Sequence, residues 1–454
     1  MHSQITNDIE NSISLDDSQS PSSIPNGLKE EDRPVNWPSF KKWSIVVSTS
    51  LATFVVSFGS SVYSAAIPHI QTRFSVSPDT ALLGITLYVI GFALGYAIFC
   101  ICQLPCALAQ NMPLLLTFRF LSGLAGSSSL AILGGMYVDF LSRPAERGIS
   151  TAVFSVATFC GPTVGPIVGN LATLKLGWRW TAWLTLIGGV VFGSVAFLLT
   201  PETSEVVILR QRFKGNTSVI PSRIYRPERG ISIFVQNYLT KPVRMFVQEP
   251  ILIFFTIYMS LAYGIIYLTF TMYPLAFVTV RGWSRMDGSL PFIGMTVGVV
   301  LACIGIALHS IYYIQQSRVH VLERRLPPMI AGSVLLSAGI FWFGWTSSRS
   351  VHWLAQAAAG AFLGSGSILV LMSGVVYLIE VYLVHANSAL AINNFLRCVI
   401  AATFPLYATD LLVDVGLGVG GTVIGSICLA LSPVSFLFWR YGRTIRQWSK
   451  FAEE

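Results

Sequence analysis

Charge is what this 454-residue sequence has least of: Asp, Glu, Lys and Arg together make up only 11% of it. A soluble domain carries about 25% charged residues, so this chain lacks the polar surface that solubility requires. Hydrophobic residues account for 53%, and the mean hydropathy is +0.65. The apolar runs are long and show no alternation of period two, which favours helices over barrel strands. The sequence therefore predicts an all-α polytopic membrane protein.

Motifs that carry enzyme chemistry are also missing. No zinc-ligand spacing, nucleophile elbow, P-loop or dinucleotide-binding loop is present, which argues against an enzyme, a bound cofactor and ATP-driven transport. All seven cysteines lie inside apolar runs, so none is placed to cross-link an external loop. Cys100, Cys102 and Cys106 are close together, but the first two point to different sides of a helix and no histidine is near. We predict neither disulfides nor a metal site.

The apolar runs fall into two groups. Residues 1–42 are rich in Ser, Asn, Asp and Pro, which is typical of a disordered tail, and residues 200–246 form a polar, basic central loop. We predict an N-terminal bundle over 43–199, a C-terminal bundle over 247–440 and a tail over 441–454. The predicted spans are 44–70, 81–109, 114–138, 150–174 and 178–199 in the first bundle, and 250–278, 289–313, 328–346, 353–379, 388–412 and 417–438 in the second.

The run over residues 81–109 does not fit this scheme. One span needs about 20 apolar residues, so 29 residues are too many for one crossing and too few for two. The two tails and alternate loops together hold 21 of the 29 Lys and Arg residues, and the positive-inside rule puts these tails and loops in the cytosol. Parity then requires an even number of crossings from the 81–109 run. The length of the run favours one crossing, whereas the distribution of Lys and Arg over the loops favours none or two. The same distribution of Lys and Arg accounts for the net charge of +8 without a nucleic-acid partner.

Several stretches together carry a family resemblance. They include "FGSSVYSAAIPHIQTRFSVS" at 58–77, "PCALAQNMPLLLTFRFLSGLAGSS" at 105–128, "GPTVGPIVGN" at 161–170 and "SALAINNFLRCVIAATFPLYA" at 388–408. The chain resembles the fungal twelve-span drug:proton antiporters of the major facilitator superfamily, in the polyamine and multidrug exporter branch. In that family, a stretch similar to "GFALG" (91–95) leads into a cytosolic loop before the next helix. Here Gly95 is joined directly to Tyr96, so the resemblance implies that spans 2 and 3 are truncated and fused.

A double Gly-Pro motif lies in the predicted span 150–174. Gly161, Gly165 and Gly169 are four residues apart on one helix face, which lets a neighbouring backbone approach closely. Pro162 and Pro166 bend the helix because proline removes intrahelical hydrogen bonds. Ordinary helix packing explains the spacing of the glycines alone. The pair of Gly-Pro steps resembles the antiporter motif of the superfamily, which is taken to seal one face of the cavity.

Arg119 stands several residues inside an apolar span. A buried guanidinium at mid-bilayer costs about 3 kcal/mol or more unless it faces water, a partner or the bundle interior. The span starts only a few residues earlier, so snorkelling to the interface is the alternative. The resemblance implies a proton-relay arginine lining the cavity, with Arg119 and Gly123 matching the family motif and Ser122 departing from it.

A second polar cluster lies in the predicted span 388–412. Asn393 and Arg397 are four residues apart on one helix face, next to Asn394. Interhelical hydrogen bonding and cavity lining remain equal alternatives for this cluster. In the N-terminal half, the candidates for cavity lining are Ser60, Ser61, Tyr63 and Tyr88. For the aromatic positions, ordinary packing is the more common alternative.

Two acids end similar stretches in the two halves. "GSSSLAILGGMYVD" ends at Asp139 and "GSGSILVLMSGVVYLIE" ends at Glu380, as expected for related repeats. We predict that both are cytosolic gate groups. The predicted fold is that of the major facilitator superfamily, with two pseudo-symmetric helical bundles.

The expected function, implied by resemblance, is proton-coupled efflux of a small amphipathic or cationic compound by a monomer in the plasma membrane. A vacuolar location, proton-coupled uptake and a transport-defective variant are the alternatives. The expected partners are the substrate, protons and the lipid bilayer.

Overall fold

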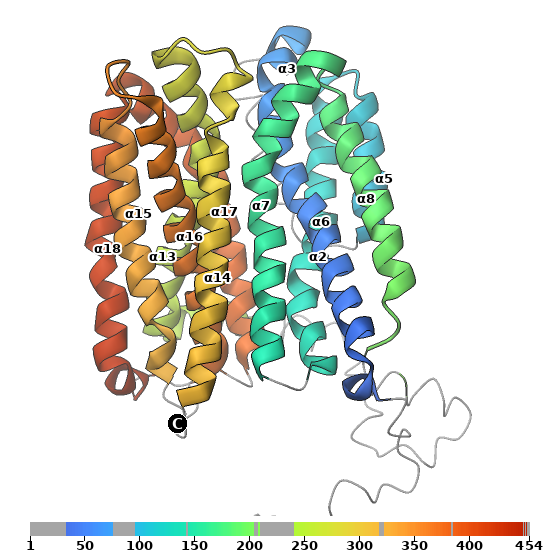
Figure 1. The fold of residues 1–454 in the computed structure, drawn as a ribbon, viewed down its shortest axis with the longest axis vertical. Helices are drawn as coiled ribbons and strands as arrows, with labels where there is room; N and C mark the ends of the chain where they lie inside the picture. Colours follow the sequence, from blue (N-terminus) through green and yellow to red (C-terminus); the bar gives the residue numbers. More distant parts are fainter. Residues whose placement is uncertain are drawn as a thin grey trace, which may run out of the picture.

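The structure is a computed structural model, and every regular element that it describes is helical. It describes residues 33–75, 96–141, 144–203, 208, 240–316, 322–382, 385–447, 449 and 451. In this part of the chain, nine helices are long and apolar enough to cross a membrane. They stand side by side in one bundle (Figure 1).

The first group of helices comes from the N-terminal half. It begins with a short 3₁₀ turn, η2 (Pro34–Asn36). The elements that follow are α2 (Ser39–Val62), η3 (Tyr63–Ala66), α3 (Ile67–Phe74), α5 (Tyr96–Leu108), α6 (Met112–Phe140), α7 (Pro144–Leu176) and α8 (Trp180–Leu199). The second 3₁₀ turn, η3, separates the long helix α2 from the short helix α3.

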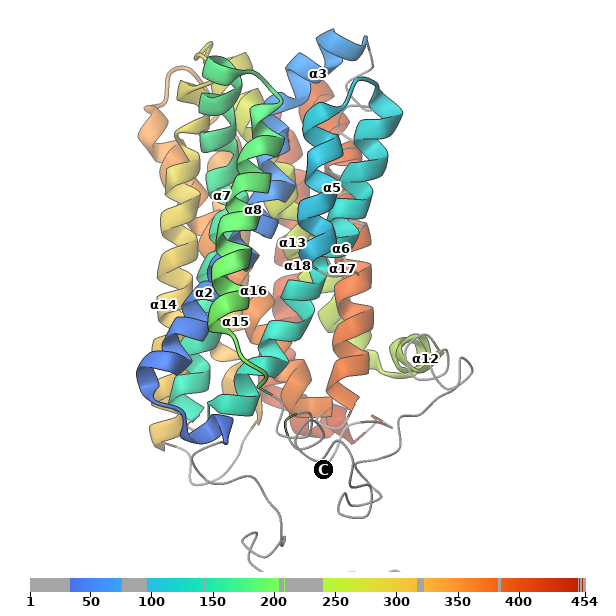
Figure 2. The ribbon, with the colours of Figure 1, turned by 90° about the vertical axis from the view of Figure 1, so that its right-hand side faces the viewer.

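The second group begins with α12 (Lys241–Gln248), which lies beside the bundle near one end (Figure 2). Its long helices are α13 (Pro250–Tyr273), α14 (Phe292–Gln316), α15 (Pro327–Trp345), α16 (Trp353–Tyr382), α17 (Ala386–Asp414) and α18 (Leu417–Arg446). Three short elements connect them: the π-helix η5 (Pro274–Val280) and the 3₁₀ turns η6 (Asp287–Ser289) and η7 (Leu322–Arg325).

The two groups meet along α7 and α14, which pack against each other (Figure 1). Helix α2 begins and helix α18 ends at the same end of the bundle, which we call the termini end. Helix α3 lies at the opposite end, which we call the far end (Figure 1). Helices α8 and α12, which flank the central loop, both meet that loop at the termini end (Figure 2).

Helix α5 is the exception among the long elements. Its 13 residues are about 20 Å long, against a hydrocarbon core of about 30 Å, so the described helix alone is too short to span. It lies beside the far-end half of α6 (Figure 2). Helices α3 and α5 both end at the far end (Figure 2). Residues 81–95, the rest of the run with the conflicting length, lie outside the described residues.

Candidate functional site

Arg119 of α6 points into the bundle toward α2. Its Nη1 and Nη2 atoms each donate a hydrogen bond of 3.2 Å to the carbonyl of Gly59, and only 4% of the residue is exposed. The carbonyl is available because the chain tightens at η3. The Tyr63 N–H bonds to Ser61 O rather than to Gly59 O, its partner in a regular α-helix. The guanidinium also lies 4.2 Å from the centre of the Tyr63 ring. Arg119 therefore points inward and does not snorkel to the interface, but it is not among the residues that line the cavity described below.

Ser60 connects this arginine to the C-terminal group of helices. Arg119 Nη2 reaches the Ser60 carbonyl at 3.5 Å, and the Tyr267 hydroxyl of α13 donates to Ser60 Oγ at 3.3 Å. The Tyr263 hydroxyl lies 3.4 Å from that of Tyr267. The Tyr263 ring lies 5.0 Å from the Arg397 guanidinium of α17. A continuous line of polar contacts therefore joins the two arginines across the two groups of helices.

Asn393 and Asn394 have different partners. Asn393 is buried and donates to Thr256 Oγ1 of α13 at 3.0 Å, so it joins two helices. Asn394 accepts a hydrogen bond of 2.7 Å from Arg397 Nη2. The remaining nitrogens of Arg397, Nε and Nη1, are buried without a hydrogen-bond partner in the structure. Asn393 thus forms an interhelical hydrogen bond, while Asn394 orients Arg397.

Acidic side chains are confined to the two ends of the bundle in the part of the chain that the structure describes. There, every Asp and Glu lies near the end of a helix or in a connection. The acid nearest to the middle of a span is Asp410, which is exposed and close to the far end of α17. The middle of the described spans therefore carries positive charge alone, at Arg119 and Arg397, while the buried Glu249 lies at the termini end.

The glycines of the double Gly-Pro motif face α2. A Cβ atom built on Gly161 would lie 2.7 Å from the backbone nitrogen of Phe58, and one on Gly165 would lie 2.9 Å from that of Val62. A Cβ atom on Gly169 would lie 2.7 Å from the Val62 carbonyl oxygen. Real Cβ atoms do not approach backbone atoms within 3.0 Å, so the contact of α7 with α2 requires glycine at these positions. Pro162 and Pro166 lie inside α7. Ser61 lies in the same contact, donating to Phe58 O at 3.2 Å and reaching Gly161 O at 3.4 Å.

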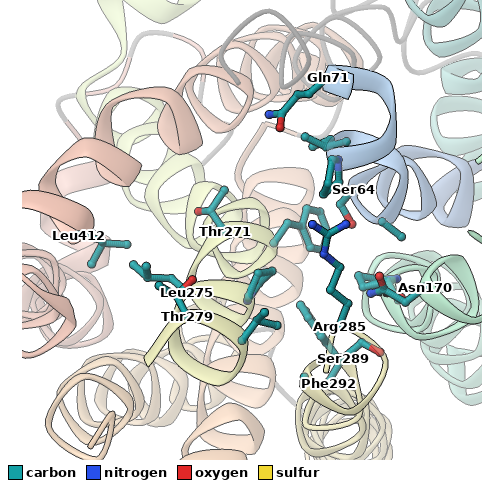
Figure 3. A pocket seen from close by; sticks show the side chains of 18 of the residues that line it. Ser64, Gln71, Asn170, Thr271, Leu275, Thr279, Arg285, Ser289, Phe292 and Leu412 are labelled. Atoms are coloured by element: carbon teal, nitrogen blue, oxygen red, sulfur yellow. Dashed lines mark hydrogen bonds between the residues drawn. The ribbon is translucent and has the colours of Figure 1, made fainter. Parts of the chain in front are cut away.

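A cavity of about 400 Å³ lies at the far end, between the two groups of helices (Figure 3). Its walls come from η3, α3, α7, α13, η5, α14 and α17, and they are mostly apolar. Phe270 lines it and also packs its ring against Tyr267 at 5.5 Å, so one aromatic ring separates the cavity from the line of polar contacts. The polar lining residues are Ser64, Gln71, Asn170, Thr271, Thr279, Arg285 and Ser289.

The termini end is closed by charged contacts. Glu380 pairs with Arg325 at 2.9 Å, and Glu323 pairs with Arg446 at 2.6 Å. Glu249 is fully buried, and it accepts hydrogen bonds from the Tyr382 hydroxyl and the Phe451 N–H, both at 3.1 Å. Asp139 lies in α6, but its side chain is outside the described set, and so is the whole of Tyr88.

Tyr263, Tyr267, Arg285 and Glu249 were not predicted from the sequence. Tyr263 and Tyr267 are four residues apart, so their shared helix face was a signal that could have found them. Arg285 lies in the connection between η5 and η6, and Glu249 lies just before α13. Charged residues are common at such places, and no local pattern distinguishes these two.

Comparison with known proteins identifies the class. The fold and the interior site define a membrane transporter, and residues 91–405 match the family model of the Major Facilitator Superfamily. The chain is 39% identical to the "Citrinin biosynthesis cluster MFS transporter mrr1" of Monascus ruber, covering 98% of this chain and 96% of the relative. It is 38% identical to the "MFS-type transporter traF" of Penicillium crustosum, with 94% and 92% covered. The chain belongs to the major facilitator superfamily.

Solved structures agree on the fold. The proton:xylose symporter XylE superposes with a TM-score of 0.61 at 17% identity, covering 89% of this chain and 96% of that one. The human organic anion transporter MFSD10 superposes with a TM-score of 0.58 at 15% identity, covering 88% and 100%. The all-α major facilitator fold predicted from the sequence is confirmed.

Proposed function

We propose that this protein exports a small amphipathic compound in exchange for protons. The observation that carries the proposal is the line of polar contacts from Arg119 to Arg397, which crosses between the two groups of helices directly beneath a cavity. Substrate sites are typically apolar cavities with a few convergent polar groups at such interfaces. The Monascus relative is named for a citrinin biosynthesis cluster, which favours a small metabolite as the cargo. The working form would be a monomer in the plasma membrane with both termini cytosolic; the vacuolar membrane is the alternative.

Each group of the site has a proposed role. We call the line of polar contacts behind Phe270 the cavity floor, although its residues do not themselves line the cavity. Arg119, with Ser60, Ser61 and Tyr63, forms its N-terminal half. Arg397 and Asn394 form the C-terminal half. The double Gly-Pro segment of α7 holds the bend that seals one face of the cavity, and Glu380 belongs to the gate at the termini end.

The direction of transport and its proton dependence are tested in cells. When an active form is expressed in a host that lacks its own pumps, we expect lower accumulation of exported dyes or drugs, and we expect a protonophore to abolish the difference. The measurement with the protonophore is needed because the middle of the described spans holds no carboxylate that could carry the proton. Accumulation unchanged across a broad compound panel would contradict export. Uptake driven by inward protons would favour the uptake carrier.

A transport-defective variant is the second candidate, and specific observations favour it. A cavity of about 820 Å³ lies among α2, α5, α6 and α8. The alignment with the Monascus relative is 482 residues long, which exceeds the 454 residues of this chain, so the relative has residues without a counterpart here. A form with the loop between spans 2 and 3 restored is therefore the active form to compare, and we expect it to transport far better.

The sequon at Asn216 reports which side the central loop occupies. Helices α8 and α12, which flank this loop, meet it at the same end as the termini (Figure 2), so we expect a cytosolic Asn216 that is never glycosylated. In a eukaryotic host, an endoglycosidase should leave the mobility of the protein unchanged. A mobility shift that disappears in Asn216→Gln would place the loop outside and overturn the topology.

A further inference from the structure

Among the described residues that line the far-end cavity, one side chain is charged, and it is a cation. Arg285 extends into the cavity toward Ser64 of η3 and Asn170 of α7 (Figure 3). The other polar lining groups are uncharged hydroxyls and amides, and the rest of the wall is aliphatic or aromatic. A ligand that fills this cavity therefore meets an apolar wall and a single guanidinium.

Arg285 is not neutralised by the described part of the protein. No hydrogen bond or ion pair to it is present among the residues described. The acid closest in sequence, Asp287, instead accepts a hydrogen bond of 2.6 Å from Ser284 and does not line the cavity. A guanidinium offers five N–H donors in a planar fork that matches a carboxylate. These donors remain available to a ligand.

The groups beneath the cavity have the same sign of charge. Phe270 separates the cavity from Tyr267, and the polar line behind it ends at Arg397, whose Nε and Nη1 atoms are buried without a partner. Buried donors without a partner are costly, and an anion would satisfy them. No described acid lies on this path from the cavity to Arg397. A cation entering here would meet the positive charges of Arg285 and Arg397 with neutral side chains between them.

We propose that the cavity binds organic anions: compounds with an apolar body and a carboxylate that pairs with Arg285. This inference names the substrate class of the proposed exporter and in that sense rests on the proposed function, but binding itself does not require transport. It departs from the cationic substrates that the family resemblance implies. The apolar body of the ligand would pack against the cavity wall formed by Phe270, Pro274 and Phe292.

Equilibrium binding to the full chain in lipid nanodiscs tests the proposal. Fluorescein and rhodamine 6G are suitable probes because they share a xanthene frame, while the first is an anion at neutral pH and the second a cation. We expect fluorescence polarisation to show saturable binding of fluorescein and little specific binding of rhodamine 6G. Arg285→Gln should weaken fluorescein binding about tenfold or more, the effect of losing a charge-assisted pair. Arg285→Lys should fall in between, since it keeps the charge without the fork.

Arg73→Gln is the matched control. Arg73 is exposed in α3 at the same end of the bundle and does not line the cavity, so the variant makes the same charge change elsewhere. It should leave fluorescein binding unchanged, and Arg285→Glu should raise the relative affinity for rhodamine 6G. Size-exclusion profiles show whether each variant is folded. If a variant fails to fold, the comparison of the two dyes on the unmodified chain still tests the proposal.

Three results would overturn the proposal: rhodamine 6G binding as well as fluorescein, no saturable binding of fluorescein, or fluorescein binding that Arg285→Gln leaves unaltered. A different result would contradict the proposed function without contradicting the anion site. Fluorescein binding that depends on Arg285, together with no export by the loop-restored form, would leave the anion site standing and remove the exporter.

Discussion

Arg119→Ala is expected to abolish transport in the loop-restored form while leaving the amount of protein in the membrane close to that of the unmodified protein. The guanidinium bonds to the Gly59 carbonyl at the point where α2 tightens into η3, and it lies over the Tyr63 ring. Losing hydrogen bonds from a charged donor costs about 3 kcal/mol, which corresponds to about a hundredfold in rate. Initial rates of export, normalised to surface protein, measure the effect.

Arg119→Lys is the informative companion variant. Lysine keeps the charge but is a point donor, so it cannot hold the Gly59 and Ser60 carbonyls together as the fork does. We expect partial activity from it. Normal export by Arg119→Ala would show that the arginine has only a packing role and would remove it from the proposed cavity floor.

Gly161→Ala is expected to destabilise the N-terminal group of helices, although it adds only one methyl group. The added Cβ would lie 2.7 Å from the Phe58 backbone nitrogen and 2.9 Å from the Phe54 carbonyl oxygen. Backbone atoms of a packed helix cannot turn away as side chains do, so α7 and α2 must separate. Overpacking of this kind costs about 1–3 kcal/mol. The expected readout is a lower midpoint of thermal aggregation for the purified protein, measured by size-exclusion chromatography.

Gly305→Ala makes the same substitution inside α14 and serves as the control. Nothing lies within 4 Å of a Cβ atom built there, so no neighbour has to move. Alanine favours a helix over glycine by about 1 kcal/mol, and the midpoint should stay the same or rise slightly. Equal loss of stability in Gly161→Ala and Gly305→Ala would contradict a specific contact between α7 and α2.

Much of the architecture could be predicted from the sequence because its causes are local or compositional. A span in a bilayer must satisfy its own backbone hydrogen bonds, so apolar length alone predicts a helix. The glycine spacing at 161, 165 and 169 likewise predicts a face for close packing, since residues four apart share one side of a helix. The family resemblance rested on the order of such segments along the chain, and the match over residues 91–405 agrees with it at the level of the superfamily.

The site depended on contacts that sequence spacing does not encode. Ser60 and Tyr267 are 207 residues apart and meet only because the two groups of helices pack together. Whether Arg119 snorkels or turns inward was open from the sequence, because both interpretations fit its position. Packing against α2 favours the inward one, since the turn at η3 leaves the Gly59 carbonyl available for the guanidinium.

The sequence by itself determined that this chain is helical, belongs in a membrane and carries its basic residues in alternate loops, because hydrophobicity and charge act on each segment separately. Only the tertiary structure decided which polar groups converge. Arg285 lies in a short polar connection with no motif that marks it. Arg397 lies in the same span as Asn393 and Asn394, and the sequence does not show which of the three has which partner. Packing placed one arginine in a cavity and left the other with buried donors unpaired, because helix contacts, and not local sequence, decide which side chains find partners.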